Sequence, residues 1–307
     1  MVKAQPNKVG AWPTFPPCLT PRCPLLPFNT GEIPQEFQEA DVLRIALLWV
    51  LCGLAIAWPG LAGAGGNIHG TVSYQGASVR EEFPTTKLPN GDYCATLAQQ
   101  KPEVFLHEGK TRLLQTIEVS PNGALKDAIV AVQDVIDPAF LASYQGTTVQ
   151  IEECEFHPYT SVVVEKRNFH VLNLDPTDHR IAQNMTVSAA HNPHGMEVQG
   201  SNSRTLFNIG LAQKGAQLNK PVVLRKRPLG SSLLLLCDQH PYMQAWFLPI
   251  TNPYYAVTAN AGTFEITNVP AGHHKVKAWH PRAGMMEKEI VVPESGDVTV
   301  LFDIPAK

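Results

Sequence analysis

The stretch "SSLLLLCDQHPYMQAWFLPI", residues 231–250, is typical of two apolar strands joined by a tight polar loop. A cysteine closes the first strand, and Cys237, His240 and Met243 then follow one another at three-residue intervals. Because the chain returns directly into a second strand, we expect these three side chains to be held close together. Thiolate, imidazole and thioether are soft donors, and as a set they favour copper.

The residue types in this loop distinguish copper from zinc. Two histidines and one cysteine, with a distant axial methionine, form the ligand set of electron-transfer copper sites. A zinc site more often takes a second cysteine or a carboxylate, and it rarely takes methionine. The loop itself lacks the second histidine. The chain contains 11 histidines, so composition alone leaves that ligand open.

The composition of the whole chain predicts an all-β protein. The 307 residues include 22 glycines and 26 prolines, which lie between short runs rich in valine, isoleucine, threonine and phenylalanine. This pattern is typical of strands joined by turns. The chain has 24 basic and 27 acidic residues, a net charge of −3, and no basic cluster beyond the short "RKR" at Arg225–Arg227. We therefore expect no nucleic-acid partner.

The N-terminal part differs from the rest. Residues 1–41 are rich in proline and lack helical or strand periodicity, so we expect a disordered leader. Residues 42–64 combine one arginine, an apolar core of about 13 residues and the A-x-A pattern Ala62–Ala64, which predicts a signal peptide cleaved after that pattern. Translation from an alternative start at Val42 would leave the leader untranslated. We expect a periplasmic or otherwise exported protein with no stable membrane span after cleavage.

Removal of the signal peptide leaves three cysteines, Cys94, Cys154 and Cys237. In an oxidising compartment a pair of cysteines is expected to form a disulfide, and an odd cysteine then needs another role. Cys237 has the metal-binding neighbours. Cys94 and Cys154 are therefore the candidate disulfide, and the alternative is two buried thiols.

The exported part divides into three blocks. Residues 65–143 form an N-terminal β region, in which residues 77–111 are polar and are expected to be irregular. Residues 144–251 contain strand-like segments separated by turn residues and include the CDQHPYM loop. Residues 252–307 alternate polar and apolar side chains between "AG" and "PAG" turns, which predicts a small antiparallel β module.

Longer motifs connect this chain to a known family. The segments "CEFHPYTSVVVEKRNFHVLNLDPTDH" (154–179), "CDQHPYM" (237–243) and "NPYYAVTANAGTFEITNVPAGHHKVKAWH" (252–280) occur in this order. Together they resemble exported plastocyanin-like proteins often labelled methylamine utilisation proteins, over about residues 68–285. The loop spacing is similar to that of amicyanin. The resemblance implies a Greek-key cupredoxin-like β-sandwich joined to a small transthyretin-like, carboxypeptidase-regulatory-like β-sandwich module.

The resemblance also implies a ligand set for one mononuclear type 1 copper. In the family the first copper histidine closes an N-x-D-x-x-x-H segment, which here is "NLDPTDH" and ends at His179. The implied metal ligands are His179, Cys237, His240 and Met243. Two positions depart from the family pattern. Arg180 stands where asparagine commonly follows the first ligand, and Tyr159 stands where a C-x-F-x-P-H segment ends in histidine.

Other histidines compete for the nitrogen position. His191 and His194, in "HNPHG", lie in a turn-rich segment and are the main rivals. His273 and His274 fall at a predicted hairpin turn and His280 follows a tryptophan in a strand, so we expect these three on the solvated surface.

The predicted function is single-electron transfer between redox partners. The chain has no G-x-S-x-G motif and no phosphate-binding glycine loop, so we predict that it is not an enzyme. The resemblance implies that electrons pass through an exposed edge of His240 to a redox protein partner. The alternative is a cell-envelope binding or interaction module in which copper is absent or incidental. Copper storage or delivery is a further alternative, and it would call for a more exposed site.

Overall fold

The computed structural model divides the chain into two units, residues 1–59 and 60–307. Its described residues all lie in the second unit and are 65–88, 93–97, 101–176, 193–198, 206, 210–211, 214–223, 232–237, 240 and 242–306. All structural statements below concern these residues. None of their helices is both long enough and apolar enough to cross a bilayer.

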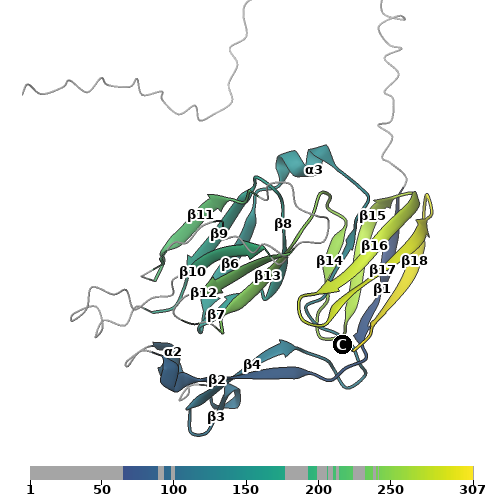
Figure 1. The fold of residues 1–307 in the computed structure, drawn as a ribbon. Coiled ribbons are helices and arrows are strands. Elements are labelled where there is room, and N and C mark those ends of the chain that lie inside the picture. The colour runs from purple at the N-terminus through teal and green to yellow at the C-terminus, as the bar shows by residue number, and fades with distance from the viewer. Residues whose placement is uncertain are drawn as a thin grey trace, which may run out of the picture. The chain divides into compact units, whose positions relative to one another are not determined.

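The described residues form mainly strands, which confirms the predicted all-β sandwich class (Figure 1). The strands in the first half are β1 (Gly65–Tyr74), β2 (Val79–Pro84), β3 (Phe105–Leu106), β4 (Thr111–Ile117), β5 (Ile129–Val132), β6 (Thr147–Glu152), β7 (Glu155–His157), β8 (Thr160–Val163) and β9 (Asn168–Asn173). Those in the second half are β10 (Pro193–Val198), β11 (Gln217–Pro221), β12 (Leu233–Cys237), β13 (Gln244–Pro249), β14 (Tyr255–Val257), β15 (Thr263–Pro270), β16 (Gly272–His280), β17 (Gly284–Val292) and β18 (Asp297–Ile304). Short helical turns are η1 (Thr85–Lys87), α2 (Tyr93–Thr96), η3 (Pro102–Val104) and α3 (Pro138–Ser143).

One pair of sheets contains strands from both ends of residues 65–306. The first sheet has the order β15-β1-β18, with β1 antiparallel to β15 and parallel to β18. The second has the order β14-β5-β16-β17. Ile68, Val130, Phe264 and Phe302 belong to the apolar core that the two sheets share. Residues 65–143 and 252–307 therefore contribute strands to common sheets, so β1 and β5 are built together with the C-terminal strands.

The other pair of sheets carries the CDQHPYM loop. Its orders are β10-β12-β13-β8 and β11-β9-β6-β7 (Figure 1). Phe169 of β9 and Phe247 of β13 meet edge to face across the interior, with ring centroids 4.9 Å apart, a favourable aromatic geometry. Both rings are fully buried, together with Leu233 and Leu235 of β12. This core fixes the two strands from which the loop projects.

Strands buried on both faces explain the continuous apolar runs in the sequence. In β5, Val130 and Val132 enter the core of the C-terminal sheets, whereas Ile129 and Ala131 join a separate cluster. That separate cluster also contains Trp246 of β13, whose neighbours in sequence face the other way. Side chains alternate along a strand, so an uninterrupted apolar run marks a strand that is covered on each side.

A third sheet belongs to neither pair. We call the described residues of 79–117, which contain this sheet, the arm, and the arm packs against the core that carries the loop. Its sheet has the order β2-β4-β3. Leu88, Leu97 and Phe105 share one buried cluster with Cys237 and Met243. The prediction that residues 77–111 are irregular was wrong for β2 and β3. The polar sequence "VREEFP" becomes a strand because β4 pairs along its whole length, a contact that local propensity does not encode.

Truncation of Phe247 tests the importance of this core for stability. We expect Phe247→Ala to lower the free energy of unfolding by about 3–5 kcal/mol, because it leaves a cavity among packed side chains. Leu301→Ala is the control, since Leu301 is 58% exposed, and it should change stability by no more than about 0.5 kcal/mol. Urea denaturation measures both, and equal effects of the two variants would contradict this packing.

Candidate metal centre

The β12–β13 hairpin places two of the proposed ligands opposite each other. Leu236 pairs with Gln244, so one further step in the same register sets Cys237 opposite Met243. The loop between them closes with a 2.8 Å hydrogen bond from the Met243 N–H to the His240 carbonyl oxygen. Cys237, His240 and Met243 are 2%, 1% and 2% exposed. The hairpin therefore gathers thiol, imidazole and thioether in one buried place.

The spacing of sulfur and nitrogen suits one metal ion. Cys237 Sγ lies 3.5 Å from His240 Nδ1. In four-coordinate thiolate–imidazole sites, bonds of about 2.3 Å to sulfur and about 2.0 Å to nitrogen at a tetrahedral angle put the two donor atoms about 3.5 Å apart. A thiol–imidazole hydrogen bond has a similar length, so it is the donor types, with Met243 beside them, that favour copper. The donor set therefore fits a copper ion.

Three of the four predicted ligands lie together, and the fourth is outside the described residues. That residue is His179, and Arg180 beside it is outside them too. If only histidine, cysteine, aspartate and glutamate are counted, the described part of the chain has no metal-binding group of three or more. Cys237 and His240 supply two such donors, and the thioether of Met243 falls outside that count.

The loop is covered, contrary to the sequence prediction. We expected His240 to offer an exposed edge, but its side chain is buried, and Tyr242 beside it is only 8% exposed. The Tyr242 ring lies 4.9 Å from the Phe83 ring of β2 and 5.9 Å from the His240 ring, measured between centroids. The arm therefore covers the loop on this side.

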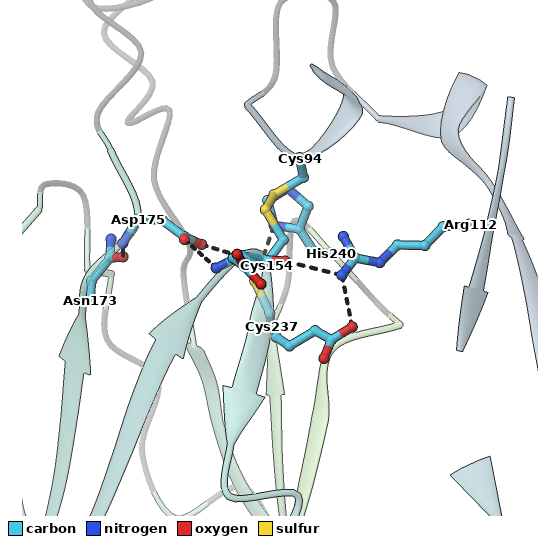
Figure 2. Close-up of a disulfide and its surroundings, with 9 residues drawn as sticks. Cys94, Arg112, Cys154, Asn173, Asp175, Cys237 and His240 are labelled. Carbon is cyan, nitrogen blue, oxygen red and sulfur yellow. Dashed lines mark hydrogen bonds and ion pairs between the residues drawn. A yellow bond between two sulfur atoms is a disulfide. The ribbon is translucent and has the colours of Figure 1, made fainter. Parts of the chain in front are cut away.

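The "NLD" part of the predicted histidine motif has a structural role that the sequence did not reveal (Figure 2). Asp175 accepts hydrogen bonds from the backbone N–H groups of Glu153 at 2.6 Å and Cys154 at 2.9 Å. Asn173 in turn accepts from the Asp175 N–H at 3.0 Å and donates to the Leu211 carbonyl at 2.9 Å. The strand that leads toward His179 is thus tied to the turn between β6 and β7.

That turn also carries a disulfide between Cys94 and Cys154, the pair that the sequence left as a candidate. Figure 2 shows the bridge close to Cys237 and His240, and all three cysteines belong to one buried cluster. The bridge joins α2 to the β6–β7 turn across 60 residues of sequence. The arm is therefore covalently tied beside the loop that it covers.

Two histidines that we expected on the surface are buried. His274 lies between Asp134 Oδ1 at 3.3 Å and the Pro270 carbonyl at 2.8 Å. His280 Nδ1 accepts hydrogen bonds from the N–H groups of Arg282 and Ala283. Both predictions of exposure were wrong because these imidazoles satisfy the backbone near two turns, which is a role for buried polar groups that sequence alone does not show.

The structure does not test His191 and His194, the two alternative candidates for the second histidine ligand. His191 lies outside the described residues. His194 belongs to β10, in which Pro193 pairs with Cys237 and the register shifts before Gly195. Its backbone is therefore next to the end of β12, although its side chain is not described.

A cavity is lined by residues of both the arm and the loop. Its volume is about 640 Å³, and Tyr242, Met243, Tyr159 and Asp127 are among its lining residues. Burial raises the pKa of the Asp127 carboxyl, Lys126 opposes that rise and Glu118 adds to it. Burial and the Asp127 charge together raise the pKa of Tyr159, the residue at the family's histidine position. Tyr159 packs near His280, with ring centroids 6.2 Å apart, so at this position the chain has a half-buried phenol.

Parts of the chain are similar to solved nitrite reductase and cupredoxin structures. No family model matches the chain, and no curated protein does. The chain is similar to part of a Cu-containing nitrite reductase (NirK) from Thermus scotoductus SA-01, with 16% identity over 35% of this chain and 23% of that chain, at a TM-score of 0.25. It is also similar to a purple cupredoxin from Nitrosopumilus maritimus, with 10% identity over 34% of this chain and 99% of that chain, at a TM-score of 0.24. A mutant of amicyanin in its reduced Cu(I) form gives 12% identity over 39% of this chain and 98% of that chain, at a TM-score of 0.25. The buried donor set of the loop is the feature of this chain that favours copper.

Replacing Asp127 with asparagine tests the electrostatics of the cavity. The folded-state pKa of Asp127 is raised above its unfolded value, so at neutral pH the ionised carboxylate costs the folded state free energy that asparagine avoids. Asparagine also tolerates the left-handed backbone at this position, where φ is 58°. We expect Asp127→Asn to raise the free energy of unfolding at neutral pH, and the gain to vanish as the pH falls below about 4, the unfolded pKa. Urea denaturation at several pH values measures this, and a gain that persists in acid would contradict the stated cause.

Proposed function

We propose that the protein is an exported type 1 copper protein that carries single electrons between redox protein partners, with copper held by His179, Cys237, His240 and Met243. The observation that carries the proposal is the buried Cys237–His240 pair, whose sulfur and nitrogen lie 3.5 Å apart beside the Met243 thioether. Soft donors in this combination stabilise copper in both of its common oxidation states. When bound, the ion would supply a one-electron couple.

The residues of the chain supply the conditions for fast electron transfer. The paired strands β12 and β13 fix the positions of Cys237 and Met243, so little movement of the ligands is needed when the charge changes. Burial of all three side chains excludes bulk water from the site. A low-dielectric shell around the donors also sets the reduction potential.

The covered loop bears on the alternatives. Storage or delivery of copper would favour an exposed and exchangeable site, whereas His240 is 1% exposed. The binding-module alternative requires no metal at all. Formation of a thiolate–copper bond therefore distinguishes an electron-transfer protein from a binding module.

A set of single substitutions tests the proposed ligands. We expect Cys237→Ser to abolish the intense sulfur-to-copper absorption of the Cu(II) protein, because only the thiolate gives that band. Loss of a residue that only supports a ligand weakens metal binding by about 10–100-fold. His179→Ala removes a proposed ligand itself, so it should weaken copper binding by more than that. His273→Ala is the matched control, since His273 is exposed in β16, and should bind as the wild type does. Copper titration monitored by visible absorption measures all three.

His194→Ala tests whether His194, rather than His179, is the fourth ligand. The proposal expects this variant to keep both the absorption band and the affinity. If His194→Ala loses them while His179→Ala keeps them, the fourth ligand is His194 and the proposed set is wrong. If Cys237→Ser keeps the band of the wild type, the thiolate site itself is wrong.

A further inference from the structure

Arg112 is a buried cation next to the candidate metal loop. It lies in β4, and its side chain is 2% exposed. Arginine is seldom buried to this extent unless it is paired. Its Nη2 donates to Glu155 Oε1 at 2.8 Å and to the Glu153 carbonyl oxygen at 3.0 Å (Figure 2). These two glutamates flank Cys154, so Arg112 holds the turn that carries the disulfide.

The same guanidinium contacts the loop through an aromatic ring. Its central carbon lies 5.0 Å from the centroid of the Tyr242 ring and 5.6 Å from that of Phe105. Both distances are within the range of a cation–π interaction. Tyr242 stands between His240 and Met243 in sequence, and its ring meets the His240 ring at a centroid distance of 5.9 Å and an interplanar angle of 74°. One ring therefore separates Arg112 from a proposed ligand.

Stability alone does not account for this arginine. Its Nε and Nη1 atoms are buried and have no hydrogen-bond partner within the described residues. A buried donor left without a partner costs about 1–3 kcal/mol, and buried ion pairs are often no more stabilising than apolar residues of similar size. A role that needs a fixed positive charge here would explain why the chain keeps it.

We propose that Arg112 is a positioning residue for the metal loop. Its guanidinium clamps Tyr242, so that His240 stays turned toward Cys237. Its charge also raises the reduction potential of the bound copper. The clamp follows from the stack on Tyr242, because displacement of that ring would free the imidazole beside it. The effect on potential follows from Coulomb's law, since a nearby cation disfavours Cu(II) more than Cu(I). The second half of this inference rests on the proposed function, whereas the clamp does not.

Cys237 provides a readout of the clamp in the metal-free protein. Its thiol is buried, so alkylation requires the loop to open. We expect Arg112→Gln and Arg112→Lys to speed alkylation of Cys237 by about tenfold, which corresponds to about 1.4 kcal/mol, because lysine cannot reproduce the flat guanidinium stack. Mass spectrometry of the Cys237 peptide from the full chain measures the rate. Arg80→Gln is the control, since Arg80 is exposed in β2 of the same arm, and it should keep the wild-type rate.

A double-mutant cycle separates the clamp from general loosening. Tyr242→Leu should speed alkylation as the arginine variants do, and adding Arg112→Gln to it should give little further increase. Additive effects would overturn the clamp, as would a wild-type rate in Arg112→Gln. If the glutamine variant shows no cooperative thermal unfolding, Arg112→Lys and Tyr242→Leu carry the same test.

The reduction potential tests the charge. In the copper-loaded protein, Arg112→Gln should have a lower potential than the wild type, and Arg112→Lys should lie closer to the wild type because it keeps a cation. Equal potentials in all three proteins would overturn the electrostatic role. If no protein binds copper as a thiolate complex but the alkylation results hold, the proposed function fails and the clamp stands.

Discussion

The pairing of β12 with β13 is the constraint on which the candidate centre depends. It sets Cys237 opposite Met243, and the short return between the strands leaves His240 with its Nδ1 atom 3.5 Å from the thiol sulfur. The two strands are fixed because Leu233, Leu235 and Phe247 fill the core beneath them. A slip of one residue would turn these side chains outward and separate the sulfur donors. Packing and ligand geometry are therefore consequences of the same register.

The sequence predicted the features that local patterns encode. Apolar runs bounded by turn residues indicated strands, and the three-residue spacing of "CDQHPYM" indicated that its donors meet. Cys94 and Cys154 were the candidate disulfide because only three cysteines follow the predicted signal peptide, and Cys237 has metal-binding neighbours. The role of His179 stays a prediction, as do export and the redox partner, because the residues or partners concerned lie outside what the structure describes.

The features that the sequence did not predict are contacts between distant residues. His240 is buried because Phe83 and Arg112 pack against Tyr242, which lies more than 120 residues further along the chain. No periodicity within either segment signals this contact. The same reason applies to His280, which is buried by a turn that needs its ring nitrogen, and to β1, whose partners β15 and β18 come from the other end of the chain. Burial of a polar side chain is decided by tertiary structure, and only the residue types can be read in advance.

The proposed function requires a thiolate–copper bond in the covered loop. The most direct measurement is visible absorption, together with electron paramagnetic resonance, on the wild-type protein loaded with one equivalent of Cu(II). We expect an intense sulfur-to-copper charge-transfer band and a narrow copper hyperfine splitting. A colourless protein, or one with only weak absorption and an ordinary wide splitting, would contradict it and would leave the β-sandwiches as a binding module.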